Sequence, residues 1–132
     1  MAFDWVTAHS ECSASKVFKE LRTGVKSDID VIDAMLAKTI SSAGHGTKPK
    51  FDVSDEPTRF LVSRQIKNGE AAQTVEFALN GLGISIEGFG IKPFQAIVDL
   101  NLDGKCVLTV DGNEVESWQV RRMALHKLLF VP

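Results

Sequence analysis

Hydrophobic residues recur at helical spacing through the first 43 positions of the chain. One apolar stripe covers residues 17–25, and a second covers residues 29–40 after Ser27, a residue type that caps helix N-termini well. Gly24 lies between the stripes, and glycine in a helix interior costs about 1 kcal/mol relative to alanine. We therefore expect two N-terminal helices, divided near Gly24; one long helix that tolerates this glycine is the alternative. The stripes consist of Val17, Phe18, Leu21 and Val25, then Ile29, Ile32, Leu36 and Ile40.

From Arg59 onward the period of the apolar residues changes from 3.6 to 2, which is typical of half-buried strands. The dipeptide Asn68-Gly69 is a strong hairpin signal, and a two-residue turn there fixes the register of the strands that it joins. This register sets apolar residues opposite apolar residues, so the assignment is self-consistent. The facing pairs that we expect are Phe60 with Phe77, Val62 with Val75, and Arg64 with Gln73.

The alternation continues beyond this hairpin. Residues 84–87 alternate apolar and polar side chains, a longer strand ends near Leu102, and another begins at Cys106. We expect the loop from Leu102 to Gly104 to end with a left-handed glycine, because this geometry keeps the apolar faces together. Residues 59–110 then form an antiparallel meander of about five strands. The loop predicts the pairs Leu100 with Cys106 and Val98 with Leu108.

A last helix is expected from Ser117 to about Leu129, with basic residues placed where they complement the helix dipole. Residues 41–58 contain two glycines and two prolines, so we expect a flexible connector there without regular structure. The order of helices, antiparallel strands and a final helix predicts a single α+β domain over residues 1–132. Its C-terminal helix packs on the sheet.

Composition narrows the class of protein. Hydrophobic residues make up 44% and charged residues 24% of the chain, and the formal net charge is −2. A disordered chain has fewer apolar residues, and a general nucleic-acid binder has a basic excess. No apolar run approaches the roughly 20 residues of a membrane span, and the first residues lack a signal-peptide pattern. We therefore expect a cytoplasmic protein without nucleic-acid or membrane partners, in which Cys12 and Cys106 are free thiols.

Residue types that often bind cofactors do not form a recognised motif. The glycine-rich segments 81–83 and 88–90 lie between strands rather than before a helix, so neither is a phosphate-binding loop. His9, Glu11 and Cys12 are close in sequence but lack the spacing of a zinc site. We expect no cofactor and no metal.

Polar residues at positions that the pattern assigns to the core are the most informative feature. Arg64 lies on the apolar face of its strand with Gln73 opposite, and Arg121 lies inside the apolar arc of the last helix. A buried arginine needs a partner. An internal carboxylate is the favoured partner, and a carboxylate or phosphate of a ligand is the alternative.

The two tryptophans allow two interpretations. Trp5 and Trp118 are expected in the core, because tryptophan is highly buried on average. The alternative is that either one anchors an interface with another molecule.

Three functional hypotheses follow. The leading one is a non-enzymatic binding domain that holds an anionic small molecule or a protein partner between sheet and helices, with Arg64, Gln73 and Arg121 as polar contacts. The second is a small enzyme that uses His45, or the pair Cys106 and His126, as the reacting groups. The third is a structural subunit that forms a homodimer or larger homo-oligomer.

Overall fold

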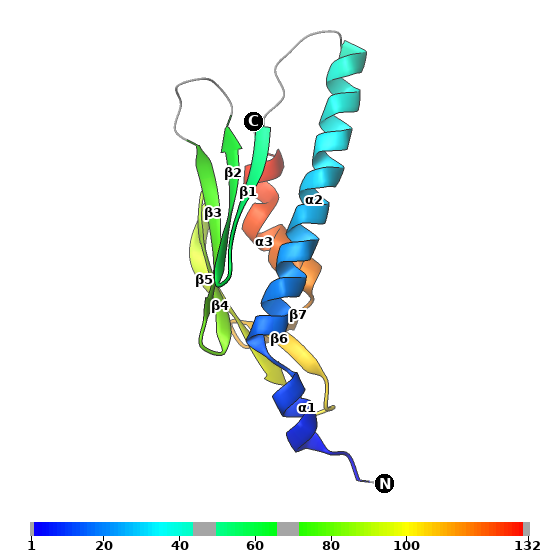
Figure 1. Cartoon of the computed structure of the whole chain (residues 1–132), viewed down its shortest axis with the longest axis vertical. Coiled ribbons are helices and arrows are strands. Elements are labelled where there is room, and N and C mark those ends of the chain that lie inside the picture. The colour runs from blue at the N-terminus through cyan, green and yellow to red at the C-terminus, as the bar shows by residue number, and fades with distance from the viewer. Residues whose placement is uncertain (1, 44–49, 66–71, 131–132) are drawn as a thin grey trace.

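A computed structural model describes residues 2–43, 50–65 and 72–130, without the side chains of residues 39–43. Its described residues form three helices and one seven-stranded antiparallel sheet in the order β1-β2-β3-β4-β5-β6-β7 (Figure 1). The elements are α1 (Trp5–Glu11), α2 (Ala14–Ala43), β1 (Lys50–Glu56), β2 (Arg59–Gln65), β3 (Gln73–Asn80), β4 (Gly83–Gly88), β5 (Ile91–Leu100), β6 (Cys106–Val110), β7 (Asn113–Val115) and α3 (Ser117–Phe130).

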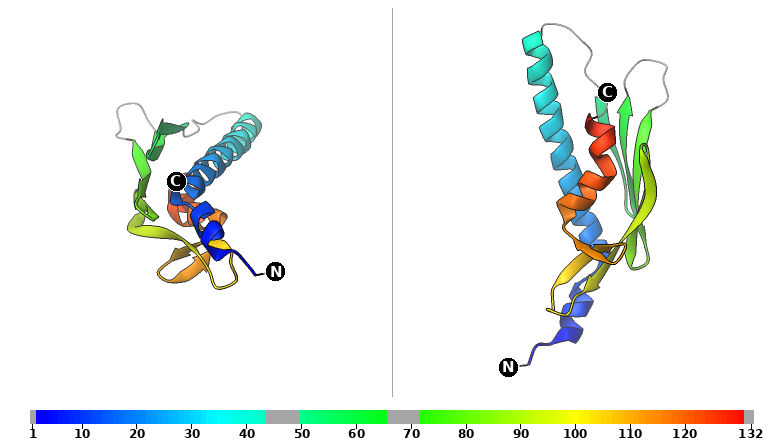
Figure 2. Two further views of the ribbon diagram at one scale, coloured as in Figure 1. Left: turned by 60° about the horizontal axis from the view of Figure 1, so that its bottom comes forward. Right: turned by 180° about the vertical axis from the view of Figure 1, so that it is seen from behind.

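The sheet curves around two of the helices. Figure 2 shows α3 and the N-terminal half of α2 on the concave face of the sheet, with α1 at one end of the molecule. The class is therefore α+β, with helices before the sheet and a helix after it. The sheet has seven strands rather than the expected five, because β1 and β7 lie outside the segment 59–110 that the alternation identified.

The position of β1 corrects the expected connector over residues 41–58. Residues 41–43 complete α2, and Lys50–Glu56 form β1, which pairs along its whole length with β2. Phe51 is buried and Val53 half-buried, whereas most other residues of β1 are exposed. A strand at the sheet edge tolerates such polar residues. Because charged residues interrupt the apolar alternation of β1, the pattern did not predict this strand.

The predicted register of the sheet is confirmed. Phe60 faces Phe77, and Val62 faces Val75. The dipeptide Asn68-Gly69 lies outside the described residues. At the other loop Gly104 has a φ of 80°, as expected for a left-handed glycine. The pairs Leu100 with Cys106 and Val98 with Leu108 are also present.

The N-terminal stripes belong to one continuous helix, so the predicted division near Gly24 is wrong. α2 spans 30 residues and passes through Gly24. A Cβ atom on Gly24 would lie 2.6 Å from Nη1 of Arg121 on α3. Glycine therefore provides room for the arginine side chain and does not end the helix.

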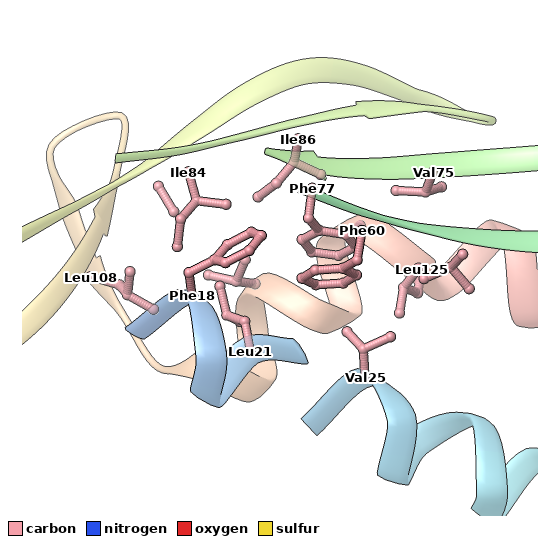
Figure 3. Close-up of a cluster of buried hydrophobic side chains, with 14 of the residues drawn as sticks. Phe18, Leu21, Val25, Phe60, Val75, Phe77, Ile84, Ile86, Leu108 and Leu125 are labelled. Carbon is pink, nitrogen blue, oxygen red and sulfur yellow. The ribbon is translucent and has the colours of Figure 1, made fainter. Parts of the chain in front are cut away.

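Three phenylalanines form the centre of the core between α2 and the sheet (Figure 3). The rings of Phe60 and Phe77 stack with their centroids 4.6 Å apart. The ring centroid of Phe18, on α2, lies 5.2 Å from that of Phe60. All three are at most 1% exposed. Other fully buried side chains around them are Leu21, Val25, Val62, Val75, Ile84, Ile86, Val120, Leu125 and Leu128.

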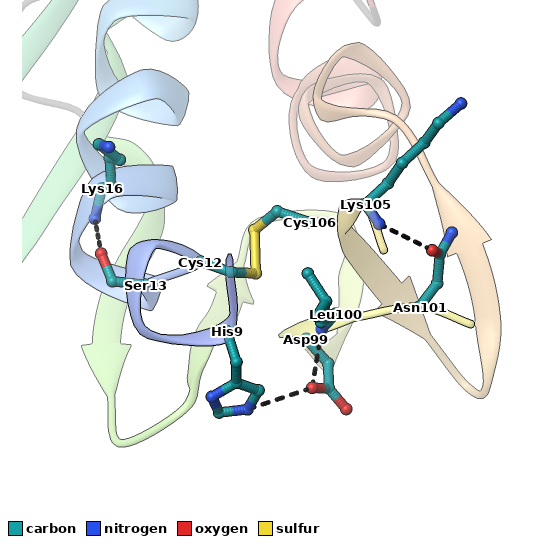
Figure 4. Close-up of a disulfide and its surroundings, with 9 residues drawn as sticks. All are labelled: His9, Cys12, Ser13, Lys16, Asp99, Leu100, Asn101, Lys105 and Cys106. Carbon is teal, nitrogen blue, oxygen red and sulfur yellow. Dashed lines mark hydrogen bonds and ion pairs between the residues drawn. A yellow bond between two sulfur atoms is a disulfide. The ribbon is translucent and has the colours of Figure 1, made fainter. Parts of the chain in front are cut away.

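Cys12 and Cys106 form a disulfide, so the prediction of free thiols is wrong (Figure 4). Their Cα atoms lie 5.3 Å apart, although the cysteines are separated by 94 positions in the sequence. The prediction rested on an inferred cytoplasmic location. The sequence pattern does not show that the fold brings the junction of α1 and α2 against the start of β6.

Candidate functional site

A groove of about 290 Å³ runs between α2 and α3. It exists because the buried stripe of α2 ends at Ile32. Of the later α2 residues with a described environment, 33–38, each is half-buried or exposed. The part of α2 after this point therefore extends beyond the core instead of packing on it (Figure 1). The apolar lining consists of Val31, Ile32 and Met35 from α2 and Trp118, Leu125, Leu129 and Phe130 from α3.

Large apolar side chains around this groove are open to solvent. The exposed fractions are 58% for Val31, 54% for Met35, 51% for Trp118 and 59% for Phe130. The largest apolar patch on a protein surface is often a functional site. Trp118 is thus not a core residue, and neither is Trp5, which is 63% exposed. The expectation that both are buried is wrong.

An ion pair lies in the groove. Arg121 Nη1 donates to Asp28 Oδ1 at 3.0 Å, which joins α3 to α2. Burial raises the pKa of the Asp28 carboxyl, and the nearby Arg121 charge opposes this shift without cancelling it. The internal carboxylate that Arg121 was expected to need is therefore Asp28.

The edge of the groove on α3 is cationic. Arg122 and His126 both line the groove and are exposed. The ring of His126 lies 5.7 Å from that of Phe130, centroid to centroid. Because Asp28 and Arg121 neutralise each other, Arg122 contributes the net charge of the groove lining at neutral pH.

Arg64 and Gln73 lie elsewhere. They face each other across β2 and β3, as predicted. Arg64 is 6% exposed, its Nη1 donates to the Leu128 carbonyl at 2.9 Å, and its guanidinium lies 5.9 Å from the centroid of the Phe51 ring. Leu128 is in the last turn of α3, where unpaired carbonyls favour a cation. Only Arg121, of the three predicted contacts, lines the groove.

Sequence reasoning missed several residues of this site, among them Val31, Met35, Arg122 and Phe130. Val31 and Met35 each lie one position before a member of the core stripe, Ile32 and Leu36. The apolar face of α2 is therefore wider than its core stripe, and this extra width was the sequence signal for the groove.

The residues proposed for catalysis do not form a site in the described chain. Cys106 is bonded to Cys12 and so has no thiol to act as a nucleophile. His126 lines the α2–α3 groove, which Cys106 does not. His45 lies outside the described residues. Within residues 2–43, 50–65 and 72–130, no three His, Cys, Asp or Glu side chains come together as a metal site.

Two further findings bear on the class of protein. No described helix is both long and apolar enough to cross a membrane. Comparison of the chain with protein-family models, with curated proteins and with solved structures gives no match.

Proposed function

We propose that this chain is a non-enzymatic binding domain whose α2–α3 groove receives an amphipathic helix of a partner protein. The observation that supports this proposal is the exposure of Val31, Met35, Trp118 and Phe130, each above half, around one groove. The partner helix carries acidic residues beside its apolar face.

The openness of the groove favours a helix over a small molecule. Small-molecule sites bury 70–90% of their ligand. Here the flanking side chains are themselves half exposed, so a small ligand would stay largely in water. An amphipathic helix buries only one face, through residues at i, i+3, i+4 and i+7, and leaves the other face solvated. Methionine and aromatic side chains adapt well to such partners.

The size of the patch favours a helix over a second copy of the chain. Taking about 150–250 Å² for each aromatic side chain and less for valine and methionine, Val31, Met35, Trp118 and Phe130 expose on the order of 400 Å² together. A stable dimer interface buries about 800 Å² on each partner. The groove therefore fits a narrower occupant than a folded domain.

The positive charge at the edge of the groove favours a partner helix with acidic residues beside its apolar face. Arg122 and His126 form the exposed edge of the groove, whereas Asp28 is already paired with Arg121. Rim charges act mainly on the rate and selectivity of association, so binding weakens as salt increases.

The anion-binding hypothesis finds less support in these contacts. Arg64 donates to the Leu128 carbonyl and Arg121 to the Asp28 carboxylate. Two arginines that already have partners inside the protein offer little to a small anion.

The test uses a fluorescein-labelled peptide of about 16 residues, with leucines at i, i+3, i+4 and i+7 and glutamates on both sides of this stripe. We expect a saturable rise in anisotropy with the wild-type domain. Trp118→Ala should weaken binding roughly 30-fold, as for an interface anchor. Leu82→Glu, at a 75% exposed position outside the groove, is the matched control and should bind as wild type.

Two results would contradict the proposal. One is a peptide that does not bind, or that binds Trp118→Ala and wild type equally. The other is sedimentation at rising protein concentration that shows a stable dimer lost in Trp118→Ala, since this would assign the groove to a second copy. A peptide with lysines in place of the glutamates checks the charge argument and should bind more weakly.

A further inference from the structure

The N-terminal arm, residues 3–11, is held to the domain mainly by one covalent bond. α1 contains no buried residue. Its side-chain contacts with the body include an ion pair of His9 Nε2 with Asp99 Oδ1 at 3.7 Å, between side chains that are 57% and 63% exposed (Figure 4). The Cys12–Cys106 disulfide directly follows the arm. An exposed ion pair contributes little, so the disulfide dominates the attachment.

The arm also touches the loop before β6. The ring of Phe3 lies against Gly104, where an added Cβ would come within 2.7 Å of it. Phe3 is nevertheless 61% exposed, so the contact buries little of the ring. A seven-residue helix is not stable on its own in water. The contacts of the arm are therefore few, and none of them buries a side chain of α1.

The disulfide is open to attack by a thiol. Cys106 is exposed and Cys12 is half-buried. A hollow of about 460 Å³ is lined by both cysteines. Cys12 also lies just before Ser13, whose hydroxyl accepts from the Lys16 amide at the start of α2. Negative charge on a Cys12 thiolate is favoured there by the dipole of α2.

We propose that the Cys12–Cys106 disulfide is a redox latch, which a dithiol reductant opens to release α1 while the rest of the fold stays intact. A thiolate of the reductant attacks Cys106 Sγ, the S–S bond breaks, and Cys12 leaves as a thiolate that takes up a proton. The second thiol of the reductant then attacks the mixed disulfide and frees Cys106. The protein gains two electrons and two protons, and the reductant ends as a disulfide.

The core explains why release stays local. The buried cluster that begins at Ala14 and Phe18 includes residues of α2, the sheet and α3, and none of α1. Opening the latch therefore frees an arm that carries the exposed side chains of Phe3, Trp5 and Val6. It leaves the stack of Phe60 on Phe77 in place.

Hydrogen exchange followed by mass spectrometry tests the latch in the full chain, with and without dithiothreitol. We expect amides in α1 to lose protection on reduction, while amides of β2 and β3 keep theirs. The double variant Cys12→Ser/Cys106→Ser is the matched control and should exchange like the reduced protein in both conditions. In Trp118→Phe, Trp5 is the single tryptophan, and its fluorescence anisotropy should fall on reduction.

Three outcomes would overturn the latch. Unchanged protection of α1 on reduction would show that noncovalent contacts hold it. Loss of protection in β2 and β3 together with α1 would make the disulfide a staple of the whole fold. Alkylation of both cysteines before any reductant is added would show that the bond is absent. None of these results depends on the peptide-binding groove.

Discussion

Gly24 of α2 is the residue on which the Arg121 side chain rests, and replacing it with alanine tests the packing of α2 on α3. A Cβ atom at Gly24 would lie 2.6 Å from Nη1 and 2.8 Å from Cζ of Arg121. Both distances are well inside van der Waals contact, so the guanidinium must move. Moving it disrupts the 3.0 Å hydrogen bond from Nη1 to Asp28.

Two effects of similar size oppose each other in Gly24→Ala. Alanine in a helix interior stabilises by about 1 kcal/mol relative to glycine. A hydrogen bond between charged groups contributes roughly 1.5–3 kcal/mol, reduced here to about 1 kcal/mol because the Asp28 side chain is 39% exposed. We therefore expect Gly24→Ala to leave the free energy of unfolding nearly unchanged. In an Arg121→Ala background the same substitution should stabilise by about 1 kcal/mol.

The assay is urea denaturation at pH 7 of wild type, the two single variants and the double variant, which form a double-mutant cycle. The structure predicts a coupling free energy of about 1 kcal/mol between Gly24 and Arg121. Equal stabilisation by Gly24→Ala in both backgrounds would refute the reasoning, because it would mean that the arginine does not occupy the space beside the glycine.

Two further predictions concern the core and the ion pair. Phe60→Ala should lower the free energy of unfolding by about 3–5 kcal/mol. Leu82→Ala, at a 75% exposed position, should change it by less than about 0.5 kcal/mol. Equal losses of stability for the two variants in urea denaturation would contradict the assignment of Phe60 to the core. Burial raises the Asp28 pKa, so the native state binds this proton more tightly than the unfolded state, and the carboxyl's contribution to stability falls as pH rises through the folded pKa. Asp28→Asn lacks this loss, so its stability relative to wild type should increase as pH rises above 3.8, the ordinary pKa of the carboxyl. A difference in stability that does not change with pH would count against the raised pKa.

The sheet was predictable where the chain obeys a local rule. Alternation with period 2, together with a turn of fixed length, determined that Phe60 faces Phe77 and that Leu100 faces Cys106. Each depends only on residues close in sequence. β1 escaped prediction because an edge strand buries few side chains and tolerates charged ones.

Tertiary contacts decided what the sequence pattern left open. The sequence pattern predicts that Gly24 divides two helices, yet its role is set by Arg121, which lies 97 positions later in the sequence. The sequence pattern predicts a carboxylate partner for Arg64, and the described contacts add one that the pattern does not suggest, from Arg64 Nη1 to the Leu128 carbonyl near the end of α3. The alternation of residues along β2 does not show that the last turn of α3 lies beside Arg64.

The groove was predictable only in part. The apolar arc predicts that Arg121 lies on the inner side of α3, and its ion pair with Asp28 places it against α2. The sequence pattern assigns Trp118 to the core, because the apolar arc of one helix does not show which of its residues a neighbouring helix covers. Trp118 lies in the first turn of α3, where it lines a second hollow together with Val17 and Glu20 of α2, and it remains 51% exposed there.

NMR mapping of the acidic amphipathic peptide on the ¹⁵N-labelled domain tests the central claim most directly. We predict that amide signals of residues 28–36 and 118–130 shift on addition of the peptide, and that the indole N–H signal of Trp118 shifts while that of Trp5 does not. Signals of β3 and β4, on the sheet, should stay in place. Shifts that concentrate on the sheet or on α1, with the Trp118 indole signal unmoved, would contradict the assignment of the α2–α3 groove as the binding site.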